Sequence, residues 1–170
     1  NDKNFIKYKQ AYFKKFKNIW HHGDYIKKTI NNGYIIYGRS DATLNSGGIR
    51  IGTAELYRVI ENMNEISESL AVEHEIYNDT EVILFVVMNK NYQLDDEIKN
   101  KIKLNLKNSL SPKHVPKKIF SVFEIPKTKS GKIVELIIKK IINGEKILNT
   151  AMLTNPHCLK EYEDIYNLIN

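Results

Sequence analysis

Three polar motifs in this sequence hold residues that could bind a phosphate or a sugar. The first is Gly23-Asp24, a Gly-Asp turn ahead of a predicted strand. Its aspartate could cap the turn, which is the commoner use of such a residue, or it could accept hydrogen bonds from the vicinal hydroxyls of a ribose. Taken alone, the turn does not decide between these uses.

The second motif is the stretch 38–58, in which Arg39 and Arg50 flank the pair Gly47-Gly48. A guanidinium group offers a fork of donors to phosphate or ribose oxygens, and two adjacent glycines let a ligand lie against the backbone. The alternative is a polar hairpin with surface arginines and a glycine turn that needs a positive φ.

The third motif is the loop 126–132, PKTKSGK, in which Lys132 directly follows Gly131. A lysine in such a loop is usually solvated, but it could also be moved into a phosphate-bearing site and withdrawn from it. The loop is not a Walker phosphate loop, because the chain contains no G-x-x-x-x-G-K-[ST] pattern.

The composition narrows the class of protein. The chain has 170 residues and no apolar run long enough to span a bilayer, so no membrane partner is expected. It begins with Asn1 rather than Met, which suggests a piece of a longer protein. The single cysteine, Cys158, cannot form an internal disulfide, and no Cys/His cluster has zinc spacing. The sequence therefore predicts a cytoplasmic location and no metal site.

The charge is distributed unevenly. The formal net charge is +6, and residues 99–140 hold twelve lysines against two acids. Such a basic run could bind a nucleic acid or a nucleotide, or it could simply face solvent. Solvated lysines are its commonest explanation, and the densest group of aromatic residues lies elsewhere, before residue 21. Nucleic-acid binding is therefore the weaker alternative, and no nucleic-acid partner is expected.

Hydrophobic periodicity predicts an α+β fold from residue 41 onward. The expected order is hairpin, helix, strand, strand, helix, strand, loop and helix, with the helices packed on a small, roughly three-stranded sheet. The run VILFVVM at 82–88 is typical of a central strand covered on both faces. The other expected strands are 34–38, 66–76 and 117–123; helices begin at Thr53 as N-cap, at 95–97 and at Ile133, and the tail 145–170 is partly helical.

Residues 1–38 do not complete a fold of their own. They carry eight lysines and, before residue 21, five phenylalanine or tyrosine rings plus Trp20. So many rings in so short a piece indicate the last part of a different domain.

The order of the motifs is more specific than any motif alone. A GD pair, a GRSD whose arginine lies 15 positions after Asp24, then GGIRIGTAE and PKTKSGK resemble the adenylate-forming acyl-CoA synthetase superfamily. HHGDY, YGRSDATLNSGGIRIGTAELYR, SPKHVP and IPKTKSGKIVELIIKKIINGE most resemble its acetoacetyl branch, over nearly the whole chain. The resemblance implies that residues 1–40 end a large N-terminal domain for ATP and the acyl group, and that 41–170 form a mobile C-terminal lid.

The resemblance also implies a role for each motif residue. Asp24 would bind the ribose hydroxyls of ATP, Arg39 would contact the ribose or the phosphates, and Arg50 would meet phosphate. Lys132 would be the lysine essential for adenylation, and Asp41 would be the hinge residue between the two domains.

Coenzyme A, the co-substrate, would meet the remaining residues. Gly47 and Gly48 would line the tunnel for its pantetheine arm. Lys107 and Lys113, with Lys103, are candidates for its phosphates because they lie in the basic run. Mg²⁺ would accompany ATP, with ligands outside this chain.

The implied reaction joins acetoacetate to coenzyme A with ATP, through an acyl-adenylate, while the lid rotates between the two half-reactions. The chain lacks the acyl pocket and is expected to be inactive without its own N-terminal domain. The first rival is an adenylation domain of the same superfamily that feeds a carrier protein, since the hinge and the lysine would serve it equally. The sequence does not identify the base that would deprotonate the thiol. His114 is a candidate, although a lone histidine before Val-Pro is more often structural.

Overall fold

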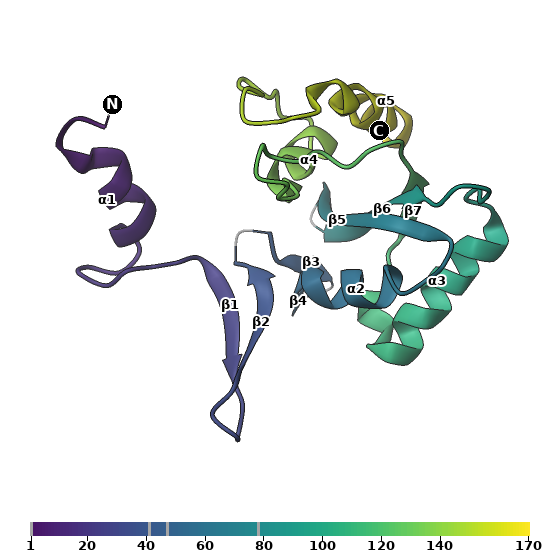
Figure 1. Ribbon diagram of the computed structural model, residues 1–170, viewed down its shortest axis with the longest axis horizontal. Helices are drawn as coiled ribbons and strands as arrows, with labels where there is room; N and C mark the ends of the chain where they lie inside the picture. The colour runs from purple at the N-terminus through teal and green to yellow at the C-terminus, as the bar shows by residue number, and fades with distance from the viewer. Residues whose placement is uncertain (1, 41, 47, 78) are drawn as a thin grey trace.

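The computed structural model describes residues 2–40, 42–46, 48–77 and 79–170. Figure 1 shows these residues in two parts, with helix α1 (Ile6–Phe13) and strands β1 (Asp24–Lys28) and β2 (Tyr34–Arg39) to one side of a larger unit of sheet and helices. The predicted α+β class is confirmed.

A three-stranded sheet forms the centre of the larger unit. Strand β5 (Ile66–Ile76) pairs antiparallel with β6 (Asp79–Met88), and β6 pairs parallel with the short β7 (Lys118–Ser121). Residues 82–86 of β6 are buried because strands flank them and helices cover both faces. The prediction of a central, doubly covered strand is therefore confirmed.

Alternate side chains of β6 enter two separate cores, as the two-residue period of a strand requires. Val82, Leu84 and Val86 belong to one hydrophobic cluster, whereas Ile83 and Phe85 belong to the other. This one strand therefore contributes to both cores. Each fully buried side chain of this size stabilises the fold by roughly 1.5–3 kcal/mol.

Two helices cover each face of the sheet, as Figure 1 shows. Helices α2 (Thr53–Ile60) and α3 (Asp96–Ser109) pack on the first core, and α4 (Glu135–Ile142) and α5 (Leu159–Ile169) pack on the second. Each helix has apolar residues at helical spacing, which gives it one buried side.

Helix α3 begins as its acidic start predicts. The Asp95 carboxylate accepts a hydrogen bond from the backbone N–H of Ile98 at 2.8 Å and so caps the first turn. Ile98, Ile102 and Leu106 are the buried residues of the helix, four apart along one side.

Replacement of Asp95 with alanine should lower the free energy of unfolding by about 1 kcal/mol, because a backbone donor loses its capping partner. Urea denaturation of the chain measures this change. The matched control is Asp96→Ala, which removes only an exposed ion pair with Lys99 and should change stability by a few tenths of a kcal/mol. Equal losses in the two variants would contradict the assignment of the cap.

The start of helix α2 corrects a prediction. Thr53 was expected to be the N-cap, but Gly52 occupies that position and the Thr53 side chain is buried inside the helix. A Cβ atom at Gly52 would lie 2.4 Å from the carbonyl oxygen of Tyr37. The close approach of strand β2 therefore requires glycine at the cap, and the helix starts at Thr53, one residue earlier than predicted.

Helix α4, in contrast, starts later than its apolar pattern predicts. Its first residue is Glu135 rather than Ile133, because Ile133 pairs across the loop with Lys127 in an isolated β-bridge. The helix ends at Ile142, and Gly144 follows it with a φ of +77°, a conformation that commonly ends helices.

Two short hairpins precede α2 in the chain. Strands β1 (Asp24–Lys28) and β2 (Tyr34–Arg39) form the first, and β3 (Leu44–Ser46) and β4 (Ile49–Ile51) form the second. In the second hairpin the register partners Leu44 and Ile51 are each 1% exposed, so its open end is anchored in the first core.

The tail packs back on the sheet, and its predicted helical content is confirmed. A 3-10 turn (Pro156–Cys158) leads into α5, and Leu153 forms a β-bridge with Thr128. The buried Tyr162 hydroxyl donates to the carbonyl oxygen of Glu124 at 2.9 Å. None of the described helices is long and apolar enough to cross a membrane.

Candidate functional site

The first hairpin brings Asp24 and Arg39 together. These residues are register partners at the open end of β1 and β2, and their side chains approach to 3.5 Å. The other Asp24 oxygen lies 2.6 Å from Nδ1 of His22, and Arg39 donates to the carbonyl oxygen of His22 at 2.9 Å. The carboxylate is thus held in a fixed position while its side chain remains 24% exposed.

The turn before Asp24 requires glycine. Gly23 has a φ of +89°, and a Cβ atom there would lie 2.8 Å from the guanidinium group of Arg39. Its carbonyl oxygen accepts from both the backbone N–H and the hydroxyl of Ser40, at 2.8 and 3.0 Å. The Gly-Asp motif therefore has a structural use, and the same turn presents the carboxylate.

Arg50 connects the second hairpin to the first. Its guanidinium carbon lies 5.7 Å from the ring centroid of Tyr25, and it also donates a hydrogen bond to the Tyr25 hydroxyl. A cation over an aromatic face is attracted by the ring, so this contact fixes the arginine between the two parts of the structure.

A groove of about 560 Å³ opens beside this contact. It is lined by the cations Lys15, Arg50 and Lys139, by one carboxylate, Glu73, and by Gly48. The excess of positive charge favours an anionic ligand such as a phosphate. Gly48 has a φ of +82° and open space where a side chain would begin, so the turn leaves its backbone accessible.

Lys132 lies at the tip of a separate loop. Its carbonyl oxygen accepts from the N–H of Thr128 at 2.8 Å, and its own N–H donates to the Thr128 hydroxyl at 3.1 Å. Gly131 completes the turn with a φ of +78°. The side chain is exposed, and its ammonium group has no hydrogen bond or ion pair with any residue that the structure describes.

The base of this loop is anchored on both sides. The Lys127 ammonium group lies 2.5 Å from a carboxylate oxygen of Glu68, and the Lys127 N–H donates to the Asn155 side chain at 3.0 Å. The N–H of Thr154 donates to the Lys127 carbonyl oxygen at 2.9 Å. A fixed base and an exposed tip let the loop present a cation to another molecule or domain.

The structure gathers the predicted residues into three places rather than one. Asp24 pairs with Arg39, Gly48 and Arg50 share the groove, and Lys132 lies apart, with no contact to either pair among the described residues. Asp41, the predicted hinge, and Gly47, the predicted partner of Gly48, fall outside the described residues.

Of the lysines predicted for the phosphates of coenzyme A, Lys107 and Lys113 are exposed and Lys103 is half-buried. Lys107 lies on α3, and Lys113 lies in the 3-10 turn that follows it (Pro112–His114). Both remain predictions.

His114 is held by contacts at both of its ring nitrogens. Nδ1 lies 2.8 Å from the Ser111 hydroxyl, and Nε2 lies 3.3 Å from a carboxylate oxygen of Glu55. These contacts favour the structural reading of this histidine.

Three residues that line the groove were not predicted as site residues from the sequence. Tyr25 sits beside the motif residue Asp24, but only the structure places Arg50 over its ring. Glu73 and Lys139 form an ion pair at 2.6 Å between residues 66 positions apart. No feature of the sequence singled out Glu73, because strand β5 contains two other glutamates.

The chain was compared with protein-family models, with curated proteins and with solved structures. No protein-family model matches the chain. An acetoacetyl-coenzyme A synthetase of Rhizobium meliloti is 43% identical over 168 residues, which is 99% of this chain and 26% of that protein. An acetoacetyl-CoA synthetase of Caenorhabditis elegans is 40% identical over 165 residues, 95% of this chain and 24% of that protein.

Among solved structures, the acetoacetyl-CoA synthetase of Streptomyces lividans superposes with a TM-score of 0.91 at 32% identity. The match covers 100% of this chain and 26% of that one. The chain therefore spans about a quarter of the length of these relatives.

Proposed function

The chain belongs to the acetoacetyl-CoA synthetase family, which it matches over the C-terminal part, and from this premise we propose that it is the lid of an AMP-forming acid–thiol ligase. The whole protein would convert acetoacetate, ATP and coenzyme A into acetoacetyl-CoA, AMP and diphosphate. The names of the matched relatives support this acid. The cytoplasm remains the expected location, since the one cysteine cannot form an internal disulfide.

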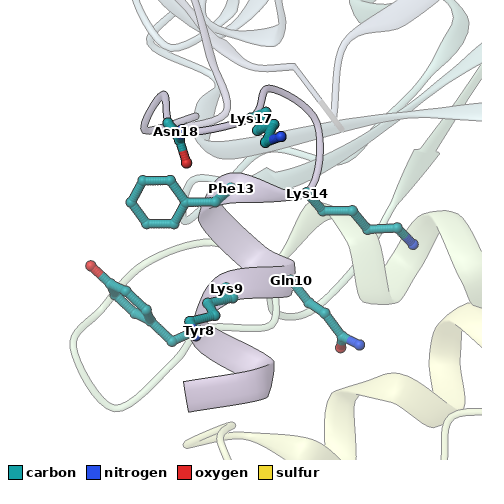
Figure 2. A pocket seen from close by; sticks show the side chains of 7 residues that line it. All are labelled: Tyr8, Lys9, Gln10, Phe13, Lys14, Lys17 and Asn18. Carbon is teal, nitrogen blue, oxygen red and sulfur yellow. The ribbon is translucent and has the colours of Figure 1, made fainter. Parts of the chain in front are cut away.

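The proposed division assigns residues 1–40 to the end of an N-terminal domain and residues 41–170 to the lid. Figure 2 shows Tyr8 and Phe13 on one side of α1 (Ile6–Phe13), where they line an open hollow of about 790 Å³. Trp20 stacks on a neighbouring ring yet is 48% exposed. An apolar surface uncovered by the described residues supports an origin at the edge of a larger domain.

In the proposed first half-reaction a carboxylate oxygen of the acid attacks the α-phosphorus of ATP, and the bond to the leaving diphosphate breaks. The acid is already ionised at neutral pH, since carboxyl groups titrate at about 4, so no general base is needed. The obstacle is the approach of two anions. Lys132 would supply a positioned cation, while Asp24 and Arg39 would hold the ribose end of the nucleotide.

In the proposed second half-reaction the thiol sulfur of coenzyme A attacks the acyl carbon. A carbon–sulfur bond forms, the bond to AMP breaks, and the thiol proton is lost. The lid would first turn about Asp41, withdrawing Lys132 and bringing Gly48 and Arg50 to the site. The open backbone at Gly48 would border the path of the pantetheine arm.

Mg²⁺ is expected with ATP, with its ligands outside this chain. The described residues contain no group of three histidine, cysteine, aspartate or glutamate side chains that could hold a metal ion.

The observation that carries the proposal is the exposed Lys132 on an anchored loop, separate from the groove that holds Gly48 and Arg50. Two half-reactions with different needs explain why one small domain presents two such surfaces. A carrier-protein adenylation domain would need the lysine loop but would not use free coenzyme A.

An assay of the full-length protein with acetoacetate, ATP and free coenzyme A tests the function. We expect consumption of the free thiol together with release of AMP. The 170-residue chain alone is the control and should turn over no ATP, because it spans only about a quarter of the length of its relatives. Acyl-AMP formation without thiol consumption would instead support a carrier-protein domain.

A further inference from the structure

Helix α4 lies between the two proposed functional surfaces. Its first residue, Glu135, follows Lys132 by three positions, and its side chains reach α2 and β5 on the other side. The helix and residues 42–44, which lead into the second hairpin, line one small crevice of about 10 Å³. Helix α4 therefore borders both surfaces.

The first connection, named here the Tyr57 contact, is the pair Tyr57–Glu135. The Tyr57 hydroxyl donates to Oε1 of Glu135 at 2.5 Å and accepts from the N–H of Ala71 at 3.1 Å. Burial and the neighbouring Glu135 carboxylate raise the pKa of Tyr57 well above its ordinary value, so the hydroxyl keeps its proton and can donate. The contact joins the first turn of α4, next to the Lys132 loop, to α2 and β5.

The second connection, named here the Glu73 ion pair, is Glu73–Lys139. Lys139 Nζ lies 2.6 Å from one carboxylate oxygen of Glu73, and the other oxygen accepts from the backbone N–H of Asn45 at 2.9 Å. The Asn45 carbonyl oxygen accepts from the Thr80 hydroxyl at 2.6 Å. The ion pair therefore joins the middle of α4 to the backbone of strand β3, in the hairpin that carries Gly48.

Stability alone is a weak explanation for these two connections. A partly buried ion pair adds little stability over apolar residues of the same size, because desolvation of both charges opposes their attraction. Hydrogen bonds to charged groups instead hold two segments in one fixed orientation. Both connections end beside a segment with a proposed role in the reaction, and both start from the same short helix.

We propose that the Tyr57 contact and the Glu73 ion pair consist of positioning residues, each serving one half-reaction. The Tyr57 contact orients the Lys132 loop for acyl-AMP formation. The Glu73 ion pair orients the hairpin of Gly48 and Arg50 for thioester formation. This inference rests on the proposed function.

The test uses Tyr57→Phe and Lys139→Met in the full-length enzyme, with the two half-reactions measured separately. Tyr57→Phe should slow acyl-AMP formation about tenfold and leave thioester formation from supplied acyl-AMP within about twofold, because one hydrogen bond to a charged group is lost beside the lysine loop. Lys139→Met should show the opposite pattern, with the KM for coenzyme A raised by about the same factor.

Matched controls come from the same regions. Lys140→Met removes the next lysine of α4, which reaches only the exposed Glu145 at 4.0 Å, and Tyr77→Phe removes a hydroxyl at an exposed turn. Both should leave the two rates unchanged. Lys139→Arg keeps a cation near Glu73 and should restore thioester formation.

The ratio of the two half-reaction rates decides the outcome, because a loss of folded enzyme lowers both rates equally. Opposite changes of this ratio in Tyr57→Phe and Lys139→Met support the inference. An unchanged ratio in both variants overturns it, whether or not the melting temperature falls. If the unaltered full-length protein forms neither acyl-AMP nor thioester, the proposed function fails; if it forms both and the variants match their controls, only this inference fails.

Discussion

Replacement of Lys132 with alanine should abolish acyl-AMP formation in the full-length enzyme, with a loss of at least about a hundredfold. The proposed reaction joins two anions, and an ammonium group in a site closed to water would stabilise the transition state far more than it would in bulk solvent. The side chain makes no hydrogen bond or ion pair within the described residues, so its removal should leave the fold intact. Release of diphosphate from ATP measures the loss.

The same variant should form the thioester from supplied acyl-AMP at nearly the normal rate. In the proposed mechanism the lid has turned away by then, so the lysine would have no part in this half-reaction. Lys129→Ala is the control, since that residue is also exposed in the same loop. A comparable loss of diphosphate release in the control would mean that the loop needs positive charge in general rather than a cation at position 132.

Replacement of Gly48 with leucine should block thioester formation, by roughly a hundredfold, and spare acyl-AMP formation. The φ of Gly48 is +82°, a conformation that costs an L-residue about 1–2 kcal/mol. A Cβ atom there meets no atom within 4 Å, so the leucine side chain would project into the groove rather than into the core. It would then occupy the proposed path of the pantetheine arm.

Gly48→Ala separates the two effects in this variant. Alanine carries the same backbone strain but little bulk, so its thioester formation should fall much less than that of Gly48→Leu. Rates with supplied acyl-AMP and varied coenzyme A make the comparison. Equal losses in the two variants would assign the defect to backbone strain and would argue against a tunnel at this position.

The fold follows from local patterns wherever neighbouring residues decide the structure. The apolar run of β6 and the acidic start of α3 each specify their element without distant partners. The prediction of the N-cap of α2 was wrong because a distant strand determines which residue fits there. The carbonyl oxygen of Tyr37 leaves room only for a glycine at position 52. No residue pattern within α2 predicts that strand β2 lies so close to its first turn.

The candidate site could be predicted only in part for the same reason. The motifs located Asp24, Arg39 and Lys132, and strand pairing then explains why the first two meet. The stacking of Arg50 on Tyr25 joins residues 25 positions apart, and the Tyr57 contact joins residues 78 positions apart. Contacts of that range depend on how helices and hairpins pack, which a single sequence does not record.

A side-by-side measurement of both half-reactions in Lys132→Ala and Gly48→Leu tests the central claim most directly. If one small domain presents first a cation and later an open backbone, the two variants must fail at opposite steps, one before and one after the acyl-adenylate. Failure of both variants at the same step would contradict a turning lid, however low the overall activity falls.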